Sequence, residues 1–162
     1  MNEFVRELAD GLPDAAEFAR AVVRLLAAVL LGAVVGYQRE QAGKAAGLRT
    51  HMLVALGAAL LMLAGAEAGM TPTNLAAVVQ GVITGIGFLG AGAILKSEQS
   101  FEIRGLTTAA GIWLTAGVGV AAGLGRWATA AMAVLASWII LTVLGRMERR
   151  LEVNAPKKKV QA

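Results

Sequence analysis

The sequence is poor in the residue types on which cross-links, metal centres and catalytic sites depend. Its 162 residues include no cysteine, three prolines, 5% aromatic residues and a single histidine, His51. The absence of cysteine excludes a disulfide framework and a cysteine-ligated metal, and one histidine is a poor metal site. No nucleophile, base and orienting group stand together, and no basic-aromatic platform for nucleic acid is present. We therefore expect no enzymatic activity, no metal, no cofactor and no nucleic-acid partner.

Apolar residues and glycine are abundant instead. Hydrophobic residues make up 57% of the chain, which also holds 20 glycines, and the mean hydropathy is +0.65. A soluble domain contains about 45–50% apolar residues. Frequent glycine in a strongly apolar chain is typical of packed membrane helices. These values predict a membrane protein with a single domain.

Apolar segments long enough to cross a bilayer recur five times, since a transmembrane helix needs about 20 mainly apolar residues. The spans are predicted at about 18–38, 50–67, 75–95, 106–124 and 126–146. They belong to a transmembrane domain over 1–153, which starts with a short interfacial segment at 2–9, and a basic tail follows over 154–162. The sequence thus predicts an all-α, polytopic membrane helix bundle.

The basic residues are concentrated on one side of this predicted bundle. Eleven of the fifteen lie in the 37–51 loop, the 95–106 loop and the C-terminal tail. Lysine and arginine are enriched in cytoplasmic loops. We therefore predict that the N-terminus lies outside and the C-terminus in the cytoplasm, which an odd number of spans allows.

An internal repeat appears when the chain is shifted against itself by 58 residues. Positions 31–65 then match 89–123 at twelve of 35 positions, including Glu40-Gln41 on Glu98-Gln99. Composition alone would give about four matches in chains this rich in Ala, Gly and Leu. The repeat predicts that spans 1–2 and 3–4 are duplicated hairpins and that span 5 is an extra helix. Coincidence between two similar hairpins is the alternative.

Glycines are spaced along spans 1 and 3 in a helical pattern. The string TGIGFLGAG (84–92) matches the spacing G-x-G-x-x-G of a dinucleotide-binding turn, but it lies inside an apolar run without a preceding strand. Small residues four apart allow close helix packing in lipid, which we take as the main interpretation. A locally unwound ion or substrate site is the alternative. The predicted packing glycines are Gly32, Gly36, Gly81, Gly85, Gly87, Gly90 and Gly92.

Polar residues gather in the two loops that precede spans 2 and 4. Arg49 and Arg104 stand at helix N-termini, where a cation opposes the helix dipole, so each is expected to have an anionic partner. Candidates are Glu40, Glu98, Glu102, a lipid phosphate or a bound anion, whereas simple anchoring of the positive side is the alternative. The threonines of these loops are plausible N-cap residues. The candidate functional cluster is Arg39, Glu40, Arg49, Thr50, Arg104, Thr107 and Thr108.

Two further polar residues lie inside predicted spans. An arginine at a helix centre costs about 2.5–3.5 kcal/mol on insertion scales, so Arg24 needs a partner or a position near the headgroups. We predict a contact of Arg24 with Gln80 or with a carbonyl, between spans 1 and 3.

Several sequence blocks resemble the MgtC/SapB family of bacterial inner-membrane proteins. They are GYQRE (36–40), AGLRTHMLVALGA (46–58), GVITGIGFLGAGAI (81–94), IRGLTTAAGIW (103–113) and GVGVAAGLG (117–125). The family's motif positions correspond here to Arg39, Arg49, Thr50, Gly85, Gly87, Gly90, Gly92, Arg104, Gly105, Leu106, Thr107 and Thr108. Some members carry Asn at the position of Thr107, and many an acid at that of Gln38. Longer members append a soluble cytoplasmic domain, and this chain is expected to act without one.

The resemblance implies a small inner-membrane protein linked to growth in low magnesium and to virulence-type stress. It implies a regulatory role through other membrane complexes, such as the rotary ATP synthase. The alternative is a transporter or channel for an ion or small anion, although the apolar cores of the spans contain no carboxylate for Mg²⁺. Expected partners are membrane lipid and a membrane protein, and homodimerisation stays open.

Overall fold

The computed structural model describes residues 14–96 and 103–147 of the chain. These residues form the helices α2 (Ala15–Gln41), α3 (Leu48–Glu67), α4 (Pro72–Gly92), α5 (Leu106–Gly123) and α6 (Trp127–Ile139). The last helix continues as a π-helical turn, η1 (Ile140–Leu144), and the short strands β1 (Leu95–Lys96) and β2 (Ile103–Arg104) stand between α4 and α5. The predicted interfacial segment 2–9 and basic tail 154–162 lie outside the described residues.

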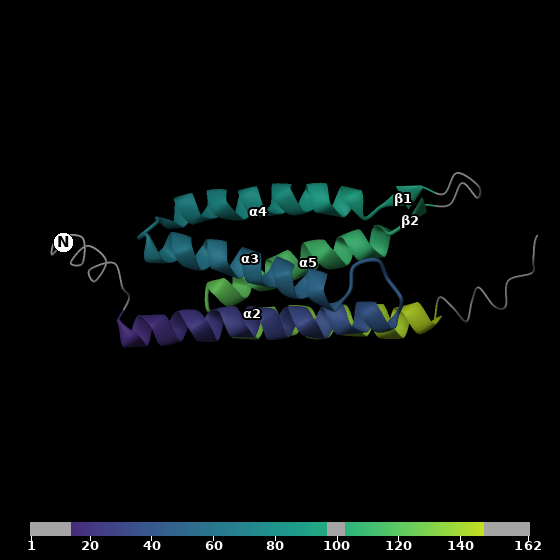
Figure 1. Ribbon diagram of the computed structural model, residues 1–162, viewed down its shortest axis with the longest axis horizontal. Helices are drawn as coiled ribbons and strands as arrows, with labels where there is room; N and C mark the ends of the chain where they lie inside the picture. The colour runs from purple at the N-terminus through teal and green to yellow at the C-terminus, as the bar shows by residue number, and fades with distance from the viewer. Residues whose placement is uncertain (1–13, 97–102, 148–162) are drawn as a thin grey trace, which may run out of the picture.

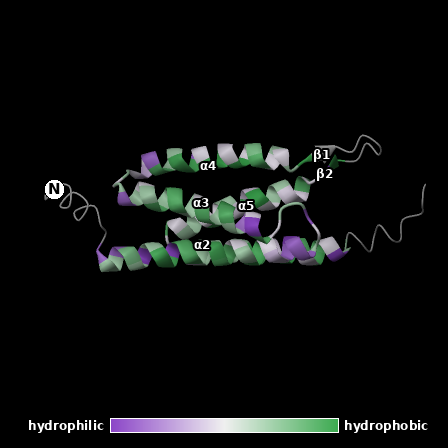
Figure 2. Ribbon diagram, viewed as in Figure 1, coloured by the Kyte–Doolittle hydropathy of each residue, from purple (hydrophilic) through white to green (hydrophobic). Residues whose placement is uncertain are grey.

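Five helices of the described chain are long and apolar enough to cross a membrane, the fifth being α6 with its continuation to Met147. Each coincides with one predicted span, so the predicted all-α bundle is confirmed. Figure 1 shows the helices running side by side, and Figure 2 shows hydrophilic residues gathered towards the helix ends. We call the end that carries residues 42–47, the two strands and residue 147 the loop end.

The helix ends are closed by local hydrogen bonds. At the start of α2, the backbone N–H of Glu17 donates to the Asp14 carboxylate over 2.6 Å, in a capping box that satisfies two backbone donors. At the end of α5, Gly125 adopts a positive φ of 72° and the N–H of Arg126 donates to the Ala121 carbonyl over 2.8 Å. This left-handed glycine stops the helix and turns the chain into α6.

Small residues hold the helices together, because they let two backbones approach closely. Ala28, Ala55, Ala59 and Ala122 form one fully buried cluster between α2, α3 and α5. A Cβ built at Gly123 would stand 2.6 Å from the Ala59 carbonyl oxygen, so α5 lies directly against the backbone of α3. The core is therefore an interface of alanine and glycine.

The helices differ greatly in how much of their surface the chain itself covers. Half of the membrane-spanning window of α5 is buried, whereas only 11% of that of α4 is. Accordingly α4 lies along one edge of the bundle (Figure 1). A central α5 and an exposed α4 mean that the two helices of the second hairpin have different environments.

The helix α4 runs unbroken from Pro72 to Gly92. The Thr84 hydroxyl donates back to the Gln80 carbonyl over 2.9 Å, which is a common arrangement inside a helix. The alternative of a helix unwound between Gly85 and Gly92 is therefore wrong for this structure. The glycine string is neither a nucleotide turn nor a helix break.

Candidate functional site

The loop end of the bundle brings together part of the predicted polar cluster. The helix α3 starts after Gly47 and α5 after Gly105, and neither N-cap has a side-chain hydrogen bond. The prediction that threonines cap these helices is therefore wrong: Thr50, Thr107 and Thr108 lie inside the first turns. Glycine is preferred at these N-cap positions because the chain passes too close to the preceding helix for a side chain.

Glu40, which is eight residues before Leu48 in the sequence, caps the N-terminus of α3. Its carboxylate accepts the backbone N–H of Leu48 over 2.7 Å, and a Cβ built at Gly47 would stand 2.8 Å from its Oε2. A carboxylate at a helix N-terminus is favoured by the helix dipole. Glu40 therefore acts as a helix cap for α3.

Three polar side chains, which we call the buried polar cluster, lie inside the loop end: Arg39 from α2, His51 from α3 and Thr108 from α5. Arg39 and Thr108 are each 3% exposed and His51 is fully buried. An Nη2 N–H of Arg39 donates to the Thr108 hydroxyl over 3.3 Å, and His51 Nδ1 lies 2.8 Å from the Gly47 carbonyl oxygen. Three helices thus meet at one polar centre.

The two cationic or basic members of this cluster keep unused hydrogen-bonding capacity. Arg39 Nε and His51 Nε2 are buried and have no partner. No carboxylate of the described residues pairs with Arg39, and the described residues contain no group of three or more His, Cys, Asp or Glu side chains able to hold a metal. An unpaired buried donor costs about 1–3 kcal/mol. The unpaired Arg39 Nε–H is therefore suited to an acceptor or an anion, and the positive charge of Arg39 repels a divalent cation. His51 Nε2 is an acceptor instead, because Nδ1–H donates to the Gly47 carbonyl oxygen.

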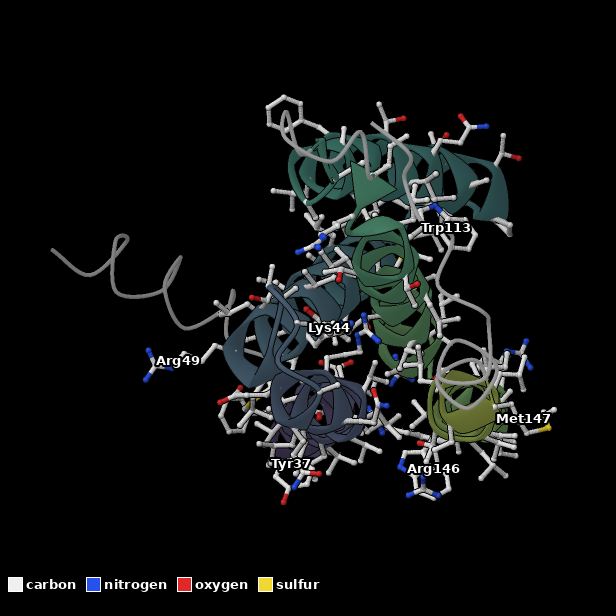
Figure 3. The ribbon with its side chains drawn as sticks, turned by 90° about the vertical axis from the view of Figure 1, so that its right-hand side faces the viewer. Tyr37, Lys44, Arg49, Trp113, Arg146 and Met147 are labelled. Carbon is white, nitrogen blue, oxygen red and sulfur yellow. The ribbon has the colours of Figure 1, made fainter. Side chains whose placement is uncertain are left out.

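The rest of the predicted polar cluster does not join this centre. Arg49, Thr50, Arg104 and Thr107 are exposed, and Figure 3 shows Arg49 pointing away from the bundle. Two proposed anionic partners, Glu98 and Glu102, lie outside the described residues. Of the seven predicted residues, Arg39 and Thr108 are joined by a hydrogen bond. The sequence reasoning missed His51, whose burial has no signature in a single sequence.

Arg24 does find a carbonyl partner, although not in the predicted helix. Its Nη1 donates to the Gly123 carbonyl over 3.1 Å, in the last turn of α5. Gln80 is exposed on α4 and is not its partner. The predicted link between spans 1 and 3 is wrong, since the contact joins spans 1 and 4. A cation at the C-terminus of a helix is favoured by the helix dipole.

The predicted packing glycines fall into two groups. A Cβ at Gly32 would meet the His51 carbonyl oxygen at 2.7 Å, and one at Gly36 would meet the Leu48 Cα at 2.8 Å, so both lie against α3. On α4, Gly90 is in ordinary contact with Ala109 at 3.6 Å. The others have no neighbouring atom within 4 Å within the described chain: Gly81, Gly85, Gly87 and Gly92. For these four, close packing needs a second molecule and stays a prediction.

An open pocket of about 370 Å³ lies between the end of α2 and the last turns of α6 with η1. Its walls comprise Tyr37, Gln38, Gln41 and Ala42 from the first segment, and Trp138, Leu141, Thr142 and Arg146 from the second. Nothing in the sequence patterns indicated it, because it depends on the π-helical turn η1, for which no sequence signature exists.

Together these features define a multi-pass membrane protein: a helical bundle with an alanine-glycine core, a cationic polar centre at the loop end and one largely uncovered helix. The profile of the MgtC family matches residues 25–150. The chain therefore belongs to the MgtC family, as its sequence blocks indicated. No solved structure matches the chain.

Three relatives illustrate this membership. Protein MgtC of Salmonella typhimurium (strain LT2) is 38% identical over 141 residues, which cover 85% of this chain and 59% of the relative. Protein SrpB of Synechococcus elongatus is 42% identical over 137 residues, covering 78% and 75%. The Escherichia coli (strain K12) protein named Putative magnesium transporter YhiD is 36% identical over 143 residues, covering 82% and 64%. The chain thus spans about three fifths of the length of the Salmonella relative.

Proposed function

We propose that this chain is a regulatory protein of the bacterial inner membrane that serves adaptation to magnesium limitation and virulence-type stress. It acts by docking α4 against another membrane protein, and the rotary ATP synthase is the first partner to test. One relative is named Putative magnesium transporter YhiD, which connects that relative with magnesium. The observation that carries the proposal is the row of outward-facing glycines on α4.

The exposed side of α4 has the properties of a helix-docking surface. Gly81, Gly85 and Gly92 follow one face at intervals of three and four residues, together with Phe88, which is 81% exposed. Lipid tails gain little from a glycine surface, whereas another helix can approach it closely and gain dispersion contacts. An aromatic side chain between glycines offers a protruding group for a recess on the partner. We call this face the α4 glycine face.

Transport of a small anion is a second candidate function, favoured by the buried polar cluster, in which Arg39 Nε is an unused donor. Cation transport fits less well, because Mg²⁺ sites rely on carboxylates and Arg39 places a buried positive charge near the loop end. An unbroken α4 also removes the opened helix on which a transport path would depend.

The orientation that this function needs has its own test. We propose that the loop end faces the cytoplasm, on the basis of the lysine and arginine distribution. A reporter protein that works only in the cytoplasm is expected to be active when it is fused after Gly145. Activity of an extracytoplasmic reporter, such as alkaline phosphatase, at this position would contradict the orientation.

The docking proposal is tested with two matched variants. Gly85→Leu fills the α4 glycine face, whereas Gly117→Leu places the same side chain on α5, where an added Cβ also meets nothing within 4 Å. ATP-driven proton pumping is measured in inverted membrane vesicles with each variant at equal abundance. We expect the unmodified chain and Gly117→Leu to lower the pumping rate, and Gly85→Leu to lose this effect.

The same proteins separate the two candidate functions. Purified chain in liposomes is expected to give no solute flux. An anion flux that depends on Arg39 would support the transport alternative and contradict the regulatory proposal, as would equal inhibition of pumping by all three proteins.

A further inference from the structure

The pocket at the end of α2 and α6 has polar walls whose hydrogen bonds are incomplete. Gln38 Oε1 and Thr142 Oγ1 are both buried and have no partner, and both residues line the pocket. Gln41, by contrast, is satisfied, since its Nε2 donates to the Tyr37 hydroxyl over 2.7 Å. A buried polar group without a partner costs about 1–3 kcal/mol. The two unsatisfied atoms therefore mark a place where a ligand with both donors and acceptors is stabilised.

The π-helical turn η1 shapes one wall of this pocket. An α-helix advances about 100° per residue, so one extra residue in a turn rotates everything after it by that amount. The turn Ile140–Leu144 comes just before Arg146, and both Thr142 and Arg146 line the pocket. Single π-turns are rare and are frequently found at functional sites. Here the turn sets the direction of the arginine relative to α2.

The charge at the pocket mouth is positive. Arg146 is exposed and forms no ion pair with a carboxylate of the described residues, and no acidic side chain lines the pocket. Figure 3, which looks at the loop end, shows Arg146 and Tyr37 at the lower edge of the bundle and Arg49 at its left edge, pointing away from them. A ligand of this pocket is expected to carry negative charge.

The pocket also lies at the depth of lipid headgroups. Its mouth stands near the end of α2, where the ring of Tyr37 is 58% exposed, and beside Arg146 at the end of the fifth span, whereas Trp138 lies deeper, in the middle of that span. Aromatic rings near the ends of such spans concentrate at the membrane–water interface. Its volume of about 370 Å³ is within the range of roughly 300–1,000 Å³ of small-molecule sites. Basic pockets between helix ends are known sites for anionic lipid headgroups.

We propose that this pocket binds the headgroup of an anionic, hydroxylated phospholipid, of which phosphatidylglycerol is the simplest example. The phosphodiester accepts hydrogen bonds from Arg146 and from the Thr142 hydroxyl. A headgroup hydroxyl donates to Gln38 Oε1, after the amide and the hydroxyl have turned from their present positions toward the ligand. The acyl chains then lie in the bilayer along the outer surfaces of α2 and α6. The site is independent of the α4 glycine face.

The proposal is tested by native mass spectrometry of the purified full chain, exchanged from detergent into equal amounts of phosphatidylglycerol and phosphatidylcholine. One phosphatidylglycerol is expected to remain bound at least about tenfold more often than phosphatidylcholine. Arg146→Gln and, separately, Thr142→Val are each expected to lower this preference about tenfold, as loss of a charge-assisted hydrogen bond predicts. Thr142→Val keeps the shape of the side chain and so guards against a folding defect.

Arg49→Gln is the matched control, because it removes the same charge from the same end of the bundle on the side away from the pocket. It is expected to leave the preference unchanged. An equal loss with Arg49→Gln would indicate nonspecific attraction and overturn the proposal, as would equal retention of both lipids. Displacement of the lipid by millimolar glycerol 3-phosphate would identify a site for a soluble phosphate ester and overturn the assignment to a lipid.

Discussion

Gly119 offers the sharpest test of the idea that backbone contact between α3 and α5 holds the bundle together. A Cβ built at Gly119 would contact the Ala55 carbonyl oxygen and stand 2.9 Å from the Ala55 Cα and from the Ala58 Cβ. Ordinary contacts of a Cβ begin near 3.4 Å. Since these partners belong to the backbone and to Cβ atoms, no side-chain rotation relieves the overlap in Gly119→Ala.

The size of the effect follows from this geometry. Restoring ordinary distances to the Ala55 Cα and the Ala58 Cβ requires a separation of at least 3.4 − 2.9, or about 0.5 Å, between α3 and α5 at this level, and the closer Ala55 carbonyl oxygen requires more. A gap of about 0.5–1 Å forfeits a quarter to a half of the dispersion energy of the contacts it opens. Overpacking a core typically costs about 1–3 kcal/mol. We expect Gly119→Ala to lower the free energy of unfolding by about 3 kcal/mol, because rigid backbone takes the strain.

Gly117→Ala is the control on the same helix. A Cβ there meets nothing within 4 Å, so we expect a change within about 0.5 kcal/mol, as for an ordinary surface substitution. Unfolding in mixed micelles of increasing SDS content, followed by tryptophan fluorescence and circular dichroism, measures both variants. A difference of about 3 kcal/mol corresponds to more than a hundredfold in the unfolding constant. Equal stability of the two variants would refute the close-packing argument.

Four further expectations concern single positions at the loop end and in the two hairpins, and the same unfolding assay measures each. Gly32→Ala is expected to lose about 2 kcal/mol, because its Cβ would meet the backbone of α3 at 2.7 Å, whereas Gly90→Ala, with ordinary contact at 3.6 Å, is expected to change by less than about 0.5 kcal/mol; similar losses would contradict the assigned packing. Gly105→Ala combines a φ of 94° with overlap onto the Ala93 carbonyl and is expected to cost at least about 2 kcal/mol; a neutral result would mean that α5 starts differently. Glu40→Ala is expected to cost about 1 kcal/mol and Glu40→Gln less, since an amide oxygen still accepts the Leu48 N–H; equal costs would exclude the capping role. Arg39→Met is expected to be neutral or stabilising, because a buried guanidinium with one neutral partner is poorly compensated; a loss above about 3 kcal/mol would show that Arg39 is structural.

Much of the fold follows from simple sequence patterns, for physical reasons. The length of each apolar run must match the bilayer, so the five spans could be predicted from hydropathy alone. A helix end can also be predicted where local chemistry decides it, as at Asp14, which forms a capping box with Glu17 three residues later. The N-terminus of α3 could not be predicted in this way, because its cap comes from Glu40, which is eight residues earlier in the sequence and lies across the loop. Local propensity carries no information about such a partner.

Residues of the candidate site could be predicted only where the spacing along a single helix decides their role. Gly32 and Gly36 were identified as packing residues because four-residue spacing on a helix is a local property. The spacing does not predict which helix each glycine faces. Gly81, Gly85, Gly87 and Gly92 of α4 in fact meet no atom of the described chain. Burial of His51 and exposure of Arg49 are decided by the rotation of α3 against α2, for which a weakly amphipathic helix gives little signal. The Arg24 partner was missed for the same reason.

The predicted duplication acquires a structural correlate in the contacts of the two hairpins. Gly32 of α2 lies against His51 of α3, and a shift of 58 residues turns this pair into Gly90 and Ala109, which also touch. These contacts do not test the repeat, which stays a prediction, because helices joined by short loops also meet in register. The test is to superpose the backbones of the two hairpins after rotation about the membrane normal. A poor fit would mean that the sequence matches arose by chance.

The two hairpins differ in how closely their helices pack, and this difference bears on function whether or not they are duplicated. The first hairpin is tight, with 2.7 Å from a Gly32 Cβ to the facing backbone, and its helices bury Arg39 and His51. The second is loose, with 3.6 Å at Gly90, and its first helix is hardly covered. A helix that packs loosely within its own hairpin loses less packing energy when it moves to bind another molecule, because fewer internal contacts must be broken. Under the docking proposal, the looser hairpin is the one whose packing a partner completes, and the tight hairpin is its fixed support.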